Sequence, residues 1–189
     1  MVRVGERCVF ATPDQKQDLA RTRALMRAWT QIEIREERDR LEREAATILG
    51  YMLFEYSRLD MELGLFLVWS NEGKELDKLT TKLSEYNFNK RLEVLQKLVQ
   101  AKYADTPQPN EIYASWLADA HETRSIRNQL FHGRWGVNPI QQQVVNILGL
   151  PTSPEQQGTP YSIADLQNAL ETMRALRARL QDLRKSWPV

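Results

Sequence analysis

Cysteine and histidine are scarce in this chain. Its 189 residues include one cysteine and two histidines, which is too few for an intramolecular disulfide or for a cluster of thiol and imidazole ligands around a metal. We therefore expect no metal site and no cofactor. The N-terminus has no apolar core of the length that a secretory signal needs, and one cysteine fits a reducing compartment. These features predict a cytoplasmic protein.

Long uninterrupted apolar runs are also missing. The longest apolar region, residues 48–69, contains four charged residues, namely Glu55, Arg58, Asp60 and Glu62. A membrane span would tolerate these charges poorly, so we expect a buried helix of a soluble protein and no membrane partner.

Net charge is nearly absent as well. The 26 lysines and arginines are balanced by 25 acidic residues, which leaves a formal charge of +1. This balance argues against a protein coated with basic residues for nucleic-acid binding, but it permits a small local anion site. The composition, 42% apolar and 27% charged, is ordinary for a globular protein, and the length fits one domain.

Apolar residues recur at helical spacing along most of the chain. The predicted helices cover residues 18–46, about 47–70, 76–88 as a short helix or turn, 89–103, about 111–131 and 162–187. Segments 105–111 and 151–160 are predicted loops, and the β-branched clusters around an Asn-Pro turn predict a β-hairpin around 134–150. The expected fold class is therefore all-α, an up-and-down bundle of four to five helices with a small β-hairpin insertion.

The domain organisation predicted from these patterns is a single helical domain over residues 1–189. Residues 1–46 form a charged helical extension whose mixed charges are typical of a solvated face or of a helix that meets a partner. Residues 133–161 form a hairpin and loop insertion.

One arginine lies on the apolar face of the helix predicted at 111–131, where a charged residue is unexpected. At about 100° per residue, an apolar stripe of this helix contains Tyr113, Trp116, Ala120, Leu130 and Phe131. Arg127 lies in the middle of this stripe, although a buried guanidinium is costly unless it is paired.

A carboxylate shows the matching irregularity in the helix predicted at 47–70. Its apolar stripe contains Leu49, Leu53, Tyr56, Leu63 and Leu67, and Asp60 falls inside it. We therefore predict a contact between Asp60 and Arg127 across the bundle. The pair can be purely structural, and Arg127 can instead reach past the stripe to water.

The segment RNQLFH at 127–132 resembles the motif of the HEPN superfamily. That motif is an arginine, four to six further residues and a histidine, at the end of a late helix in an all-α bundle. A polar residue often follows the arginine, as Asn128 does here. The acidic but otherwise apolar segment FEYSRLDMELGLFLVW is also similar to a helix of that superfamily. The resemblance covers about residues 47–135 and, in a general way, the last helix.

The resemblance implies a metal-independent endoribonuclease that works as a homodimer. Arg127 would bind the scissile phosphate and His132 would act as general acid or base. Asn128 would orient the histidine or bind the phosphate, and Asp60 would position Arg127. The RNA's own 2′-hydroxyl would be the nucleophile.

Four further residues are candidates for a supporting role at such a site. Arg124 would add local basicity, and Arg134, Trp135 and His121 are candidate RNA contacts. Trp135 can stack on a base, or it can pack the hairpin onto the bundle. Arg134 stands where toxins paired with nucleotidyltransferase antitoxins carry a tyrosine, so modification of such a tyrosine is not expected here.

The partners that the resemblance implies are RNA, a second copy of the chain and an antitoxin protein, in a toxin–antitoxin or phage-defence setting. Two alternatives stay open. The chain can be a non-catalytic HEPN-like module that binds nucleic acid or protein, or a bundle whose long charged N-terminal helix serves assembly alone. In the last case, protein groups would fully occupy Arg127 and His132.

Overall fold

The computed structural model describes residues 29–152 and 156–189. The helices of this part of the chain are α2 (Gln31–Val68), α3 (Leu76–Ser84), α4 (Phe88–Lys102), α5 (Pro107–His132) and α6 (Ile163–Ser186), with a short 3-10 helix, η1 (Ser70–Gly73). The strands are β1 (Arg134–Asn138), β2 (Gln143–Leu148) and β3 (Gln157–Tyr161). The prediction of a mostly helical bundle with a small β element is confirmed at this level.

Helix α2 is one continuous helix of 38 residues, so the predicted break between residues 46 and 47 is wrong. Thr30 caps its first turn, because the Thr30 hydroxyl accepts from the Glu33 amide and the Glu33 carboxylate accepts from the Thr30 amide. Leu41 and Ala45 are buried in the core, so residues 31–46 belong to the folded unit. The rest of the predicted N-terminal extension, residues 1–28, lies outside the described residues.

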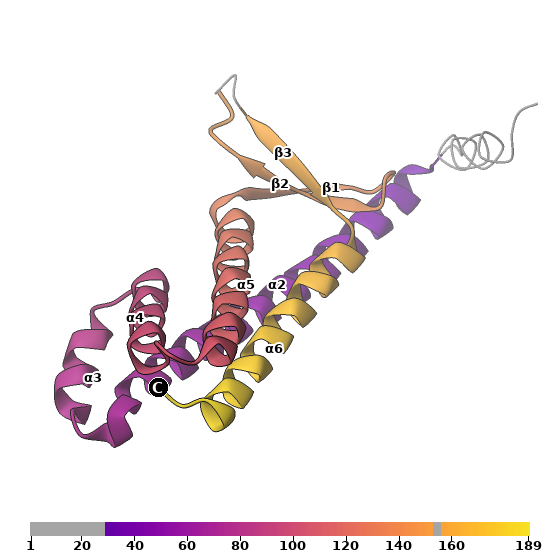
Figure 1. Cartoon of the computed structure of the whole chain (residues 1–189). Coiled ribbons are helices and arrows are strands. Elements are labelled where there is room, and N and C mark those ends of the chain that lie inside the picture. Colours follow the sequence, from indigo (N-terminus) through magenta and orange to yellow (C-terminus); the bar gives the residue numbers. More distant parts are fainter. Residues whose placement is uncertain (1–28, 153–155) are drawn as a thin grey trace, which may run out of the picture.

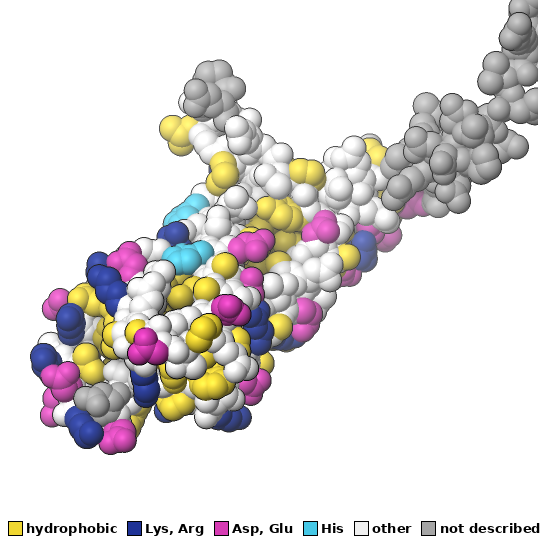
Figure 2. All heavy atoms as spheres, in the orientation of Figure 1, with side chains coloured by type: hydrophobic (Ala, Val, Ile, Leu, Met, Phe, Trp, Pro, Cys, Tyr) yellow, Lys and Arg dark blue, Asp and Glu magenta, His cyan; other side chains and the backbone are white. Residues whose placement is uncertain are grey.

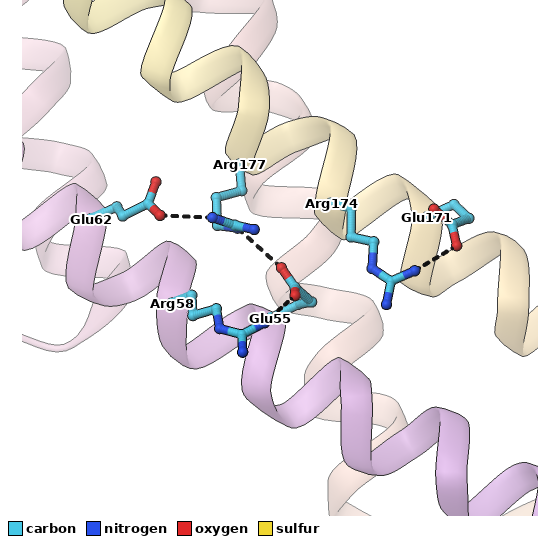
Figure 3. A network of polar contacts seen from close by, with 6 residues as sticks. All are labelled: Glu55, Arg58, Glu62, Glu171, Arg174 and Arg177. Carbon is cyan, nitrogen blue, oxygen red and sulfur yellow. Dashed lines mark hydrogen bonds and ion pairs between the residues drawn. The ribbon is translucent and has the colours of Figure 1, made fainter.

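Helices α2 and α6 run side by side in the same direction (Figure 1), and an ion-pair network joins them (Figure 3). Arg177 of α6 lies 3.0 Å from the carboxylate of Glu55 and 2.8 Å from that of Glu62, both on α2. Arg58 adds a second cation to Glu55, which is only 4% exposed. Because a buried carboxylate without partners is costly, this network fixes how α6 lies along α2.

Helix α5 runs antiparallel to α6 (Figure 1). It places two large, fully buried side chains, Tyr113 and Trp116, in the bundle core. The Trp116 indole donates to the Leu176 carbonyl oxygen at 3.0 Å, and the Tyr113 hydroxyl donates to the Trp187 carbonyl oxygen at 2.6 Å. The predicted loop at 105–111 is helical from Pro107. Prolines fit the first turn of a helix because amides there have no partner within the helix.

The small sheet has the order β1-β2-β3 and is antiparallel throughout. It lies at the end of the bundle where α5 ends and α6 begins (Figure 1). The hairpin predicted around 134–150 is confirmed, with Trp135 opposite Asn146. Strand β3 falls in a predicted loop, because its sequence, QGTPY, has little strand preference and pairing with β2 decides its conformation.

Candidate functional site

The guanidinium of Arg127 lies between two aromatic rings. Its central carbon is 5.4 Å from the ring centre of Tyr56 on α2 and 5.6 Å from that of Phe131 on α5. Nη1 donates to the Asn128 side-chain oxygen at 3.2 Å, whereas the Nε atom is buried and has no hydrogen-bond partner. Arg127 therefore lies on the apolar stripe, as the helical wheel indicates, with one buried N–H donor unused.

The predicted ion pair between Asp60 and Arg127 is wrong, because Asp60 pairs with Arg91 of α4. Arg91 Nη1 donates to the Asp60 carboxylate at 2.7 Å and to the Asp60 carbonyl oxygen at 3.1 Å. Arg91 Nη2 also donates to the Leu83 carbonyl oxygen at 3.1 Å. The carboxylate is thus neutralised by another helix, and Asp60 does not hold Arg127.

Arg124, like Arg127, has no carboxylate partner, whereas the other half-buried arginines have one. Six arginines among the described residues are half-buried: Arg40, Arg91, Arg124, Arg127, Arg174 and Arg177. Four of them have a carboxylate partner within 3.0 Å. Arg124 and Arg127 have none, and each has a buried Nε without a hydrogen bond. The two residues are three positions apart on α5, so their side chains are neighbours.

The hydroxyl of Tyr56 interacts electrostatically with Arg127, Asp60 and Arg124. Burial raises the pKa of its hydroxyl to about 12, while the positive charges of Arg127 and Arg124 lower it and the charge of Asp60 raises it. The hydroxyl is therefore neutral at physiological pH. The ring also lies 5.0 Å from that of Phe88, centre to centre, which fixes the surface on which Arg127 rests.

Strand β2 holds the C-terminal end of α5. The amide of Asn146, which is 2% exposed, donates to the Leu130 carbonyl oxygen at 3.2 Å, and the Trp135 indole donates to the same oxygen at 3.1 Å. A Cβ on Gly133 would lie 2.1 Å from the Asn146 side-chain oxygen, so this position needs a glycine for close approach. Trp135 also lies 5.9 Å from the Tyr161 ring, centre to centre, and joins the hairpin to the helix end.

His132 is the last residue of α5, and its side chain is exposed. It forms no hydrogen bond with any described residue. Asn128 lies one turn before it, and its side-chain oxygen accepts the bond from Arg127. Full occupation of Arg127 and His132 by protein groups, expected if the chain served assembly alone, is therefore not found among the described residues.

His121 and Arg134 are both exposed. Arg134 Nη2 lies 3.4 Å from the Gly149 carbonyl oxygen. The chain's two histidines lie on one face of the molecule with a basic side chain between them (Figure 2). The two histidines of α5 thus share a face of the molecule with a basic side chain (Figure 2).

Within the described ranges, no helix is long and apolar enough to cross a membrane, and no group of three or more His, Cys, Asp or Glu side chains could hold a metal ion. No protein-family model matches the sequence, and searches of curated proteins and of solved structures find no match. A function is therefore inferred from the chain's own residues.

Proposed function

We propose that the surface formed by Arg124, Arg127, Asn128 and His132 binds a phosphate group of RNA, and that the protein is an endoribonuclease of HEPN type. The observation that carries this proposal is the pair of half-buried guanidiniums without a carboxylate. Charged groups in such positions normally have partners of opposite charge. An external anion would supply the missing partner.

A phosphodiester suits the donors that this surface offers. Its non-bridging oxygens accept hydrogen bonds from guanidinium N–H groups, and arginine matches phosphate geometry better than lysine does. The rings of Tyr56 and Phe131 hold the Arg127 guanidinium in place, so binding would cost less side-chain entropy. A cation stabilises the charge of a transition state best when it is already held in position before the reaction.

The proposed reaction is attack of the 2′-hydroxyl on the adjacent phosphorus. The new P–O2′ bond forms while the P–O5′ bond breaks, which leaves a 2′,3′-cyclic phosphate and a 5′-hydroxyl. One base removes the 2′-hydroxyl proton and one acid protonates the leaving 5′-oxygen. Histidine is the side chain best suited to both roles near neutral pH, and two copies of the chain would supply two His132 side chains.

A non-catalytic nucleic-acid-binding module is the second candidate, and one observation favours it. No described residue hydrogen-bonds to the His132 imidazole, whereas a catalytic histidine is usually oriented by a further group. In that case Arg124 and Arg127 would bind RNA phosphates, and His132 would only contribute to the surface.

The test is cleavage of a single-stranded RNA in the presence of EDTA, with the ends identified chemically. We expect the native chain to leave cyclic-phosphate and 5′-hydroxyl ends. His132→Ala should lower the rate about 10²- to 10⁴-fold, and Arg127→Met about 10²- to 10³-fold.

Arg174→Met is the matched control for the loss of a charge. Arg174 is also half-buried, but it pairs with Glu171 on its own helix (Figure 3), so this variant should cut RNA at the native rate. Binding without cleavage, weakened by Arg127→Met and unchanged by His132→Ala, would favour the binding module. If the native chain neither binds nor cuts RNA, both candidates are contradicted.

A further inference from the structure

A pocket of about 250 Å³ lies between the first half of α2 and the strands β1 and β2. Ala45 and Ala46 line it on the helix side, and Trp135 and Val137 line it on the strand side. The small alanine side chains leave room between helix and sheet, and Ala46 is exposed, so the pocket opens to solvent there. Pockets for drug-sized ligands measure about 300–1,000 Å³, so this one suits a single flat ring system.

The aromatic wall of the pocket is fixed in place. The Trp135 indole donates to the Leu130 carbonyl oxygen at 3.1 Å, and its ring lies 5.9 Å from that of Tyr161, centre to centre. The ring therefore keeps its position whether or not the pocket is filled. Aromatic faces of this kind are the surfaces on which proteins stack unpaired bases.

Two charged side chains of α2 stand at the mouth of the pocket. Arg38 and Glu42 line it, and both are exposed. They lie one turn apart, so their side chains are neighbours, yet within the described part of the chain neither forms an ion pair or a hydrogen bond. Arg40 on the same helix, by contrast, pairs with Glu37 and Glu44. A guanidinium and a carboxylate are thus both available to one ligand.

The pocket continues into the surface that holds Arg127. Leu49 lines the pocket and Tyr56 supports Arg127, and these two residues lie on one side of α2, two turns or about 10 Å apart. Leu53 lies between them and is 47% exposed, although its place in the apolar stripe predicts a buried residue. Phe131, the second ring beside Arg127, packs against the same buried cluster as Leu49. An RNA strand with a phosphate at Arg127 can therefore place a neighbouring base in the pocket.

Guanine is the base that matches the two groups at the mouth. Its Watson–Crick edge carries two adjacent donors, N1–H and the N2 amino group, which suit the two oxygens of one carboxylate. Its O6 and N7 atoms accept two hydrogen bonds from one guanidinium. Each of the other three bases has a single donor group on that edge, so it gives a carboxylate one hydrogen bond instead of two.

We propose that this pocket binds a guanine base of the RNA, next to the phosphate bound at Arg127. The base stacks on Trp135, Glu42 accepts from N1–H and the N2 amino group, and Arg38 donates to O6 and N7. The inference rests on the proposed function and adds a base preference to it. The protein thus selects RNA that carries a guanosine beside the bound phosphate.

Binding of RNA that cannot be cut tests this preference. The probes are four short single strands of 2′-O-methyluridine that differ only in one central base, and fluorescence anisotropy gives their dissociation constants. We expect the strand with guanine to bind at least about tenfold tighter than the other three, which is the lower part of the range for one bidentate base contact. Arg127→Met should weaken all four strands alike and keep the preference, because the phosphate and the base bind to different residues.

Two substitutions at exposed positions locate the base. Glu42→Gln removes one of the two acceptor oxygens, and Ala46→Leu fills the pocket, so each should reduce the preference for guanine to less than about threefold. Glu36→Gln and Thr47→Leu are the matched controls. Both positions are exposed on α2 and lie outside the pocket, so these variants should keep the tenfold preference. Circular dichroism should show native helix content in all four variants.

The outcomes separate this inference from the proposed function. Equal affinity for the four strands, or a guanine preference that survives both Glu42→Gln and Ala46→Leu, would overturn the inference and leave the phosphate site intact. A preference for another base that Ala46→Leu removes would overturn the choice of guanine. Binding of none of the four strands would contradict the proposed function and, with it, this inference.

Discussion

Replacing Arg127 with methionine should leave the fold nearly as stable as it is now. Arg127 has no carboxylate partner, and its buried Nε without a hydrogen bond costs about 1–3 kcal/mol. Methionine removes that cost. It also removes the two ring contacts, at about 0.5–1 kcal/mol each, and the bond to Asn128, at about 1 kcal/mol.

These contributions nearly cancel, and a methionine thioether packs well between the rings of Tyr56 and Phe131. We therefore expect the free energy of unfolding to change by no more than about 1–2 kcal/mol. Urea unfolding at pH 7, followed by tryptophan fluorescence, measures this change.

The control is the same substitution at Arg177. Its guanidinium bridges Glu55 and Glu62, and Glu55 is buried, so Arg177→Met should cost about 3–5 kcal/mol. A loss of 3 kcal/mol or more in Arg127→Met would refute the reasoning, because it would show that Arg127 stabilises the fold as a paired charge does.

Three further predictions follow from the structure. Gly133→Ala should lower the free energy of unfolding by about 1–3 kcal/mol, because a methyl group would lie 2.1 Å from the buried Asn146 side-chain oxygen. Urea unfolding measures this change, and a midpoint equal to that of the native chain would show that Asn146 can move away. Asp60→Asn should lower the free energy of unfolding by about 1–2 kcal/mol, because it weakens the pair with Arg91. The affinity for RNA should stay within about twofold of the native value. A large loss of affinity would show that Asp60 does act on the proposed site. Tyr56 has a folded pKa raised to about 12, so its stabilising contribution is complete below pH 10 and is lost as pH rises towards 12. Between pH 9 and 12, the free energy of unfolding of Tyr56→Phe should therefore fall by about 2–3 kcal/mol less than that of the native chain. An equal fall in the two proteins would contradict this.

Local patterns were enough to predict the hairpin and most of the helical segments, but not the continuity of α2 or the start of α5 at Pro107. The end of α5 at Gly133 and the start of α6 at Ser162 are both encoded in residues next to them. The Ser162 hydroxyl accepts from the Asp165 amide, which is a contact within one turn. Periodicity likewise placed Arg127 on the apolar stripe.

Long-range partners could not be predicted in the same way. The wheel shows that Asp60 faces the bundle, but whether it meets Arg91 or Arg127 depends on where α4 and α5 cross α2. The continuity of α2 was missed because the change from charged to apolar sequence near residue 46 indicates a change of environment and not a helix end. The pairing of Glu55 with Arg177 was missed for the same reason as that of Asp60, since it joins residues 122 positions apart.

The most direct test of the proposed phosphate site is an NMR titration of the arginine Nε–H signals with a single-stranded RNA whose 2′-hydroxyls are methylated, so that it cannot be cut. We expect the signals of Arg124 and Arg127 to shift on binding, because their Nε donors are unused in the free protein. The signals of Arg91 and Arg177 should stay in place, because their Nε atoms already donate to Leu83 and Glu55. Unchanged Arg124 and Arg127 signals at saturating RNA, or equal shifts of all four, would contradict the proposed site.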